Sequence, residues 1–111
     1  MNTDLTKNLL TPENILRKQF PNGVTVLLHE NPWSKTAAIC GSLFAGCCLE
    51  SPEKIGLSAF TAAALPSGTP FRSGTQISEY LESIGGAIDF CSGPHTINFK
   101  GKCLSEDLPE L

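Results

Sequence analysis

The sequence predicts an α+β fold, in which helices pack on one face of a mostly antiparallel sheet. Strand-like segments follow one another in pairs with short turns between them, which favours antiparallel pairing. The two clearest helix-like segments lie together in the middle of the chain and do not alternate with strands. The predicted order, β-β-β-α-α-β-β and the beginning of a further helix, is typical of this class.

The first two strands flank a tight turn. The segment "ILRKQFPNGVTVLLHENP" predicts a strand at 16–20, a turn at 21–23 and a second strand at 24–29. Asn-Gly between two apolar runs is a strong hairpin signal, because both residues tolerate a positive φ. Residues 1–13 are predicted to be a polar lead-in, and residues 14–111 to form the domain.

The central part of the chain predicts one long strand and two helices. The strand extends over 36–50 and the first helix over 55–65. The second helix is the clearer one, because Ser73 and Gln76 match a capping box and Gly85-Gly86 supply a left-handed cap. Its apolar stripe has the helical spacing i, i+3, i+4, i+7 and consists of Ile77, Tyr80, Leu81 and Ile84.

Two short strands and the start of a helix complete the sequence. Apolar and polar residues alternate at 88–90 and again at 96–100, with a Ser-Gly-Pro turn between them. Ser105 is predicted to be an N-cap, with acidic residues in the first helical turn. Because the chain stops within this helix, we expect a domain that is truncated there.

Composition argues against several classes of function. A formal net charge of −3 and the lack of a basic run argue against nucleic-acid binding. No apolar run approaches the roughly 20 residues that cross a bilayer, and the N-terminal segment does not resemble a signal peptide. The five cysteines include no C-x-x-C pair and are predicted to be free thiols that act as small core residues. Free thiols favour a reducing compartment, the cytoplasm.

Few patterns in the sequence carry chemistry by themselves. His29 is interpreted as an exposed residue at a strand end, and His95 as a loop residue. Adjacent Cys47 and Cys48 are predicted to point to opposite faces of the long strand. No serine lies in a nucleophile elbow of the G-x-S-x-G type.

Four stretches, taken in order, resemble the pitrilysin/insulinase family of inverted zinc peptidases, which includes the mitochondrial processing peptidase. They are "FPNGVTVLLHENP", "GSLFAGCCLESPEKIGLSAF", "LPSGTPFRSGTQISEYLESIGGAIDF" and "TINFKGKCLSEDLPEL". Together they cover nearly everything from about residue 15 to residue 111, in the order and spacing of that family. The resemblance implies the first part of a metallopeptidase-like α/β roll.

Active members of that family carry H-x-x-E-H on the first helix. The two histidines, one turn apart, bind Zn²⁺, and the glutamate acts as a general base. Aligned on Gly56-Leu57 and Gly68-Thr69, the motif falls on Ala59-Phe60-Thr61-Ala62-Ala63. Ala59 and Ala63 replace the histidines and Ala62 the glutamate, so the resemblance implies a degenerate site that has no metal and no cofactor. The family's third ligand, a glutamate further along the chain, would lie past Leu111.

Three functions remain open. The resemblance implies a non-catalytic domain or subunit that pairs with an active zinc-peptidase homologue, or with the second half of the same chain, and helps to enclose a peptide substrate. Zinc is then expected only in the active partner. The alternative is a purely structural subunit, like the respiratory-complex core proteins that share this fold. The third, an active peptidase, requires zinc on residues such as Cys47, Cys48 and His95, whose spacing matches no known zinc pattern. Exposed apolar surface also predicts homo-oligomers.

Overall fold

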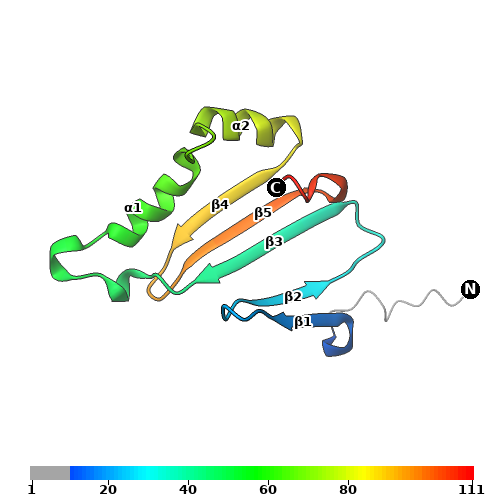
Figure 1. Cartoon of the computed structure of the whole chain (residues 1–111), viewed down its shortest axis with the longest axis horizontal. Helices are drawn as coiled ribbons and strands as arrows, with labels where there is room; N and C mark the ends of the chain where they lie inside the picture. Colours follow the sequence, from blue (N-terminus) through cyan, green and yellow to red (C-terminus); the bar gives the residue numbers. More distant parts are fainter. Residues whose placement is uncertain (1–10) are drawn as a thin grey trace, which may run out of the picture. The chain divides into compact units, whose positions relative to one another are not determined.

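The computed structural model describes residues 11–111 and is shown in Figure 1. Contacts within the chain divide it into two units, residues 1–34 and residues 35–111. Each unit has its own antiparallel sheet. The first unit therefore ends after the first hairpin. Most of the lead-in predicted over residues 1–13 lies outside the described residues.

The first unit contains the predicted hairpin. Strand β1 (Ile15–Gln19) pairs with β2 (Thr25–His29), and the five-residue register aligns Ile15 with His29. The connection differs from a two-residue Asn-Gly turn, because only Gly23 adopts a positive φ, of 88°. A loop that ends in a left-handed glycine still matches the twist of the strands. His29 ends β2 as predicted, but it is half-buried and not exposed.

The second unit is built on a three-stranded sheet with the order β3-β5-β4, whose strands lie side by side in Figure 1. Its strands are β3 (Thr36–Leu43), β5 (Ile97–Leu104) and β4 (Ala87–Ser92). Both pairings are antiparallel. The helices follow β3 and precede β4 in the chain, so the predicted α+β order is confirmed.

The two faces of this sheet differ in character. On one face of β5, Ile97, Gly101 and Cys103 are buried, whereas the alternate residues Lys100 and Lys102 are exposed. Ser92 of β4 lies opposite Ile97, on the buried face, and its hydroxyl bonds to Ser58 of α1 (Leu57–Ala64). The start of α1 therefore lies against the apolar side of the sheet at the end of β4.

Helix α2 (Gly74–Ser83) has the predicted capping box and apolar stripe. The Gln76 amide donates to Ser73 Oγ at 3.2 Å, and the Ser73 amide donates to Gln76 Oε1 at 2.8 Å. Gly85 provides the left-handed residue after the helix, with a φ of 60°. The predicted stripe is half-buried along its whole length, and its members are Ile77, Tyr80, Leu81 and Ile84.

The long strand predicted over 36–50 is wrong after Leu43. Residues Cys47–Leu49 form a 3₁₀ helix, so Cys47 and Cys48 do not alternate across a sheet. The reason is a tertiary contact: Gly46 lies so close to the backbone of Pro94 and His95 that a Cβ atom would clash with it. Backbone hydrogen bonds join the turn at 46–48 to the β4–β5 turn at 93–95. The sequence pattern does not reveal this contact.

Two smaller predictions also need correction. The cysteines are free, but only Cys103 is buried, so the prediction of thiols in the core is wrong for the other four. Ser105 begins a 3₁₀ helix, Ser105–Asp107, and makes no N-cap, because Leu104 holds the cap position. In the described part of the second unit, the buried apolar side chains are few: Ala62, Ile97 and Cys103.

Candidate functional site

The N-terminus of α1 is held by a carboxylate from the preceding loop. Glu50 accepts hydrogen bonds from the amides of Gly56 and Ser58, both at 2.7 Å, and from the Ser58 hydroxyl at 2.6 Å. These bonds, chiefly the one from the Ser58 hydroxyl, lower the pKa of Glu50 below its ordinary value of 4.5. A negative charge at this end of the helix also complements the helix dipole. Sequence reasoning missed Glu50, because the contact crosses a loop.

The same contact ties α1 to the end of β4. The Ser92 hydroxyl donates to Ser58 Oγ at 2.9 Å, so Glu50, Ser58 and Ser92 form one chain of hydrogen bonds. Ser58 is 6% exposed, which places the middle of this chain inside the protein. Because a buried hydroxyl with partners on both sides has little freedom, the start of α1 is fixed against β4.

The three alanines that the family resemblance aligns with the zinc motif, Ala59, Ala62 and Ala63, lie on two sides of α1. Ala59 and Ala63 are four residues apart and are both exposed, as two ligands on one helical face would be. Ala62 is only 4% exposed and lies one turn after buried Ser58, on the same side of α1. Ala59 and Ala63 thus have the spacing of two ligands on one helical face, but their methyl groups supply no donor atom.

These residues do not fit a zinc ion. Structural and catalytic zinc sites use three or four nitrogen, sulfur or oxygen ligands, and a methyl group supplies none. Within residues 11–111, no group of three or more His, Cys, Asp or Glu side chains lies close enough to hold a metal. Cys48 and His95 do come together, with 3.3 Å between Sγ and Nδ1, but two ligands make no such group. The predicted loop position of His95 is confirmed, whereas its thiol partner was not predicted.

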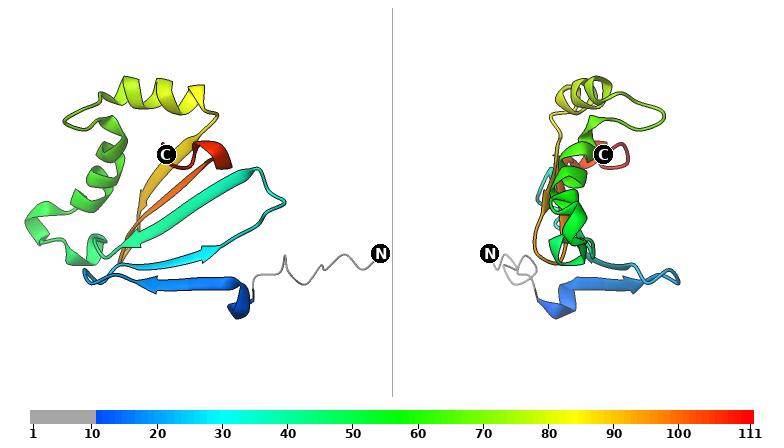
Figure 2. Two further views of the ribbon diagram at one scale, coloured as in Figure 1. Left: turned by 45° about the vertical axis from the view of Figure 1, so that its right-hand side comes forward. Right: turned by 90° about the vertical axis from the view of Figure 1, so that its left-hand side faces the viewer.

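Strand β4 is the outer strand of its sheet on the side of α1. Its hydrogen-bonded neighbour is β5, and α1 runs alongside β4 in Figures 1 and 2. Contacts between α1 and β4 are the most numerous that this helix makes with any strand.

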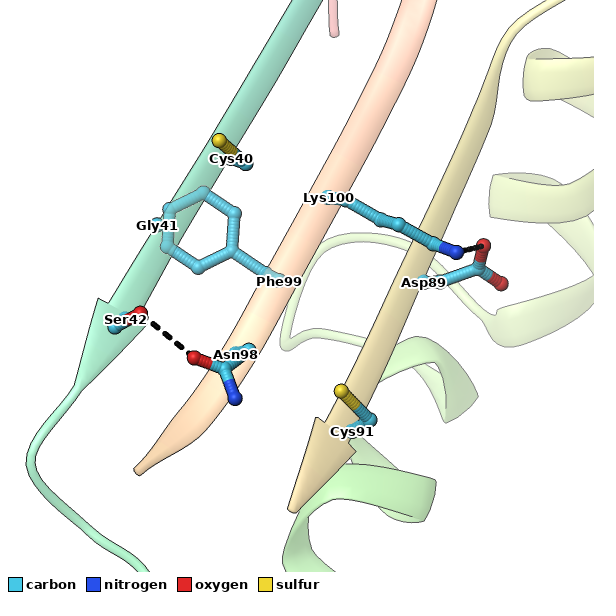
Figure 3. A pocket seen from close by; sticks show the side chains of 8 residues that line it. All are labelled: Cys40, Gly41, Ser42, Asp89, Cys91, Asn98, Phe99 and Lys100. Atoms are coloured by element: carbon cyan, nitrogen blue, oxygen red, sulfur yellow. Dashed lines mark hydrogen bonds and ion pairs between the residues drawn. The ribbon is translucent and has the colours of Figure 1, made fainter. Parts of the chain in front are cut away.

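The exposed face of the sheet carries a hollow of about 530 Å³, shown in Figure 3. Ion-paired side chains lie across it, with 3.5 Å between Lys100 Nζ and Asp89 Oδ2. At one end, Ser42 Oγ donates to Asn98 Oδ1 at 2.6 Å. The hollow spans β3, β5 and β4, and its lining residues are Cys40, Gly41, Ser42, Asp89, Cys91, Asn98, Phe99 and Lys100.

No helix in the described range, residues 11–111, combines the length and the apolar character that crossing a bilayer requires.

Comparison with known proteins identifies the relatives of this chain. Residues 25–111 match the model of the insulinase family, peptidase family M16. An uncharacterized zinc protease of Rickettsia bellii is 30% identical over 95 residues, which is 86% of this chain and 23% of that protein. An uncharacterized zinc protease of Bacillus subtilis is 30% identical over 92 residues, or 83% of this chain and 22% of its own length.

The chain thus spans about a quarter of the length of these curated relatives. The match includes α1, its capping loop, α2 and the sheet β3-β5-β4. With the family model covering most of the sequence, the chain belongs to the insulinase family, peptidase family M16.

Proposed function

We propose that this chain is a non-catalytic member of its family, which pairs with an active homologue and helps to bind the peptide that the homologue cleaves. The observation that supports the proposal is that α1 keeps its packing but has no side chain that could bind zinc at Ala59 and Ala63. Its N-terminal capping by Glu50 and its packing on β4 are intact, while Ala59 and Ala63 supply no donor atom. A helix that keeps its position but has no metal ligands can still border the region that binds the peptide.

The edge of β4 is suited to accept a peptide strand. The Gly93 amide donates to Thr96 O at 2.8 Å, so Gly93 and Thr96 form a hydrogen-bonded pair. Bonded and non-bonded pairs alternate along an antiparallel ladder. The backbone groups of Ile88, Phe90 and Ser92 therefore point away from β5, toward the free edge. An extended peptide that pairs with this edge satisfies them by β-augmentation.

The hollow on the exposed face supports the same proposal. Alternate side chains of an added strand project to the same face as Asp89 and Cys91 of β4. Asp89 and Cys91 border the hollow of about 530 Å³, which offers those side chains both apolar contact and the Lys100–Asp89 pair. The backbone edge then supplies affinity, and the hollow supplies selectivity among side chains.

The alternative is a structural subunit with no part in proteolysis. The exposed apolar side chains near α1 favour this role, since Ile55 is 82% exposed and Phe60 is 74% exposed. Such residues commonly mark protein–protein contacts. Both functions therefore require a partner, and they differ in whether cleavage depends on this chain.

Reconstitution with an H-x-x-E-H homologue separates the two functions. The expected result is peptide cleavage by the mixture and none by this chain alone. Stable assembly with no change in cleavage would favour the structural role. Hydrolysis by the purified chain, together with stoichiometric zinc, would overturn both.

A matched pair of variants tests the β4 edge. Phe90→Pro removes the outward amide together with the aromatic ring, whereas Phe90→Ala removes the ring alone. We expect Phe90→Pro to weaken peptide binding by about tenfold beyond Phe90→Ala, equivalent to one lost backbone hydrogen bond. Isothermal titration with an unstructured peptide substrate of the partner measures this difference, and equal affinities would exclude the edge as the binding element.

A further inference from the structure

A thiol and an imidazole meet outside the degenerate motif. Cys48 Sγ lies 3.3 Å from His95 Nδ1, within hydrogen-bond distance for sulfur. Both side chains are exposed. The two residues are 47 positions apart in the chain, so the contact is made by the fold and not by local sequence.

The backbone around this pair is firmly held. Three hydrogen bonds join the turn at 46–48 to the turn at 93–95. The Gly46 amide donates to His95 O at 3.0 Å, the Cys47 amide to Gly93 O at 3.1 Å and the Cys48 amide to Pro94 O at 2.9 Å. Because the main chain on both sides is held, bringing the thiol and the imidazole together costs less entropy than it would in a flexible loop.

We propose that Cys48 is the reactive thiol of this protein and a site of modification by hydroperoxides and other soft electrophiles. With the imidazole proton on Nε2, Nδ1 accepts the hydrogen bond from the thiol and takes its proton as sulfur attacks. An adjacent base of this kind activates a cysteine nucleophile. The neighbouring Cys47 is also exposed but has no such contact with His95 among the described residues.

The reaction with a hydroperoxide balances as follows. The Cys48 sulfur attacks one peroxide oxygen, an S–O bond forms and the O–O bond breaks. Sulfur is oxidised to a sulfenic acid, and the peroxide is reduced to an alcohol or to water. The proton taken by His95 passes to the departing oxygen, so the imidazole returns to its neutral form.

The surroundings of the pair favour this assignment. Helix α1, which contacts the turn that carries Cys48, has no ionisable side chain in "LSAFTAAA". Glu50, two residues beyond Cys48, directs its carboxylate to Gly56 and Ser58 instead. The imidazole is thus the titratable partner that the described contacts give this thiol.

Peptide-resolved mass spectrometry with limiting iodoacetamide at neutral pH tests the proposal. We expect Cys48 of the folded protein to react about a hundredfold faster than Cys47, the low end of the effect of a positioned base. In denaturing urea the two rates should converge. A second arm treats the protein with hydrogen peroxide and traps sulfenic acid with dimedone, which should label Cys48 first.

The variant His95→Asn removes the base and keeps the backbone carbonyl that holds Gly46. We expect it to lower the Cys48 rate to that of Cys47 and to leave the rates of Cys40 and Cys91 unchanged. Equal rates of Cys47 and Cys48 in the folded wild-type protein would overturn the proposal without any variant. The proposal would also be overturned if Cys48 still reacted faster than Cys47 in the His95→Asn variant.

Discussion

The carboxylate of Glu50 holds Ser58 through two hydrogen bonds, one from the amide at 2.7 Å and one from the hydroxyl at 2.6 Å. Ser58 in turn accepts from Ser92 of β4. This relationship places the first turn of α1 beside the end of β4, and it does so independently of any zinc ligand. The position of α1 in this protein is thus maintained by its cap.

Glu50→Gln should destabilise the protein at neutral pH, because the amide side chain keeps one acceptor but loses the charge that strengthens all three bonds. The melting temperature measures the change. Glu53→Gln removes a nearby exposed carboxylate and is the matched control. Equal melting temperatures for the two variants would show that the Glu50 cap contributes nothing to stability.

The cap also predicts a pH dependence of stability. Since folding lowers the pKa of Glu50, its contribution is fully present above the ordinary value of 4.5 and is lost as the pH falls through the lowered value. Urea unfolding of wild type and Glu50→Gln should therefore differ at pH 7 and converge in acid. A difference that grows on acidification would contradict the sign of this shift.

A side chain at Gly41 in β3 should destabilise the protein. The ring of Phe99 lies over Gly41, where a Cβ atom would overlap it, so a larger residue must displace the ring. We expect Gly41→Val to cost about 1–2 kcal/mol in the free energy of unfolding. Ala38→Val, at an exposed position of the same strand, should change it little. If Phe99→Ala does not reduce the cost of Gly41→Val, the ring is not its cause.

Introducing H-x-x-E-H at Ala59, Ala62 and Ala63, the positions that the family resemblance assigns to it, should not create a peptidase. Ala59→His and Ala63→His fall on exposed positions and should each cost only about 0.5 kcal/mol through helix propensity. Ala62→Glu introduces a carboxylate at a buried position and should cost at least about 2 kcal/mol. Even if the triple variant folds, two histidines and a general base leave zinc without its third protein ligand. Peptide hydrolysis by the triple variant alone would disprove this prediction.

The exposed aromatic residues of the second unit should drive association. Phe71 is 92% exposed and Phe60 is 74% exposed, and burying each between two molecules gains apolar contact. Sedimentation velocity should show a species that grows with protein concentration and weakens in Phe60→Ser/Phe71→Ser. Thr75→Ser, another exposed position of the second unit, is a conservative control. A purely monomeric wild type at high concentration would contradict the prediction.

Local patterns sufficed for most of the secondary structure. The capping box of Ser73 and Gln76 satisfies the start of α2 within four residues, so its prediction needs no tertiary information. The stripe of α2 and the pairing of β1 with β2 were likewise correct. The long strand was wrong after Leu43, because the close approach of Gly46 to the His95 backbone comes from a distant turn.

The sequence by itself determined the order of the strands and helices. It also determined that Ala59 and Ala63 cannot bind a metal, since a methyl group offers no lone pair in any conformation. Only the tertiary structure decided which side chains meet: Glu50 with Ser58, Ser92 with Ser58, and Cys48 with His95. The spacing of apolar residues in the sequence predicts the face of a strand or helix on which a residue lies. It does not predict which loop packs against that residue. Contacts between segments far apart in the chain depend on how the whole sheet and its turns come together.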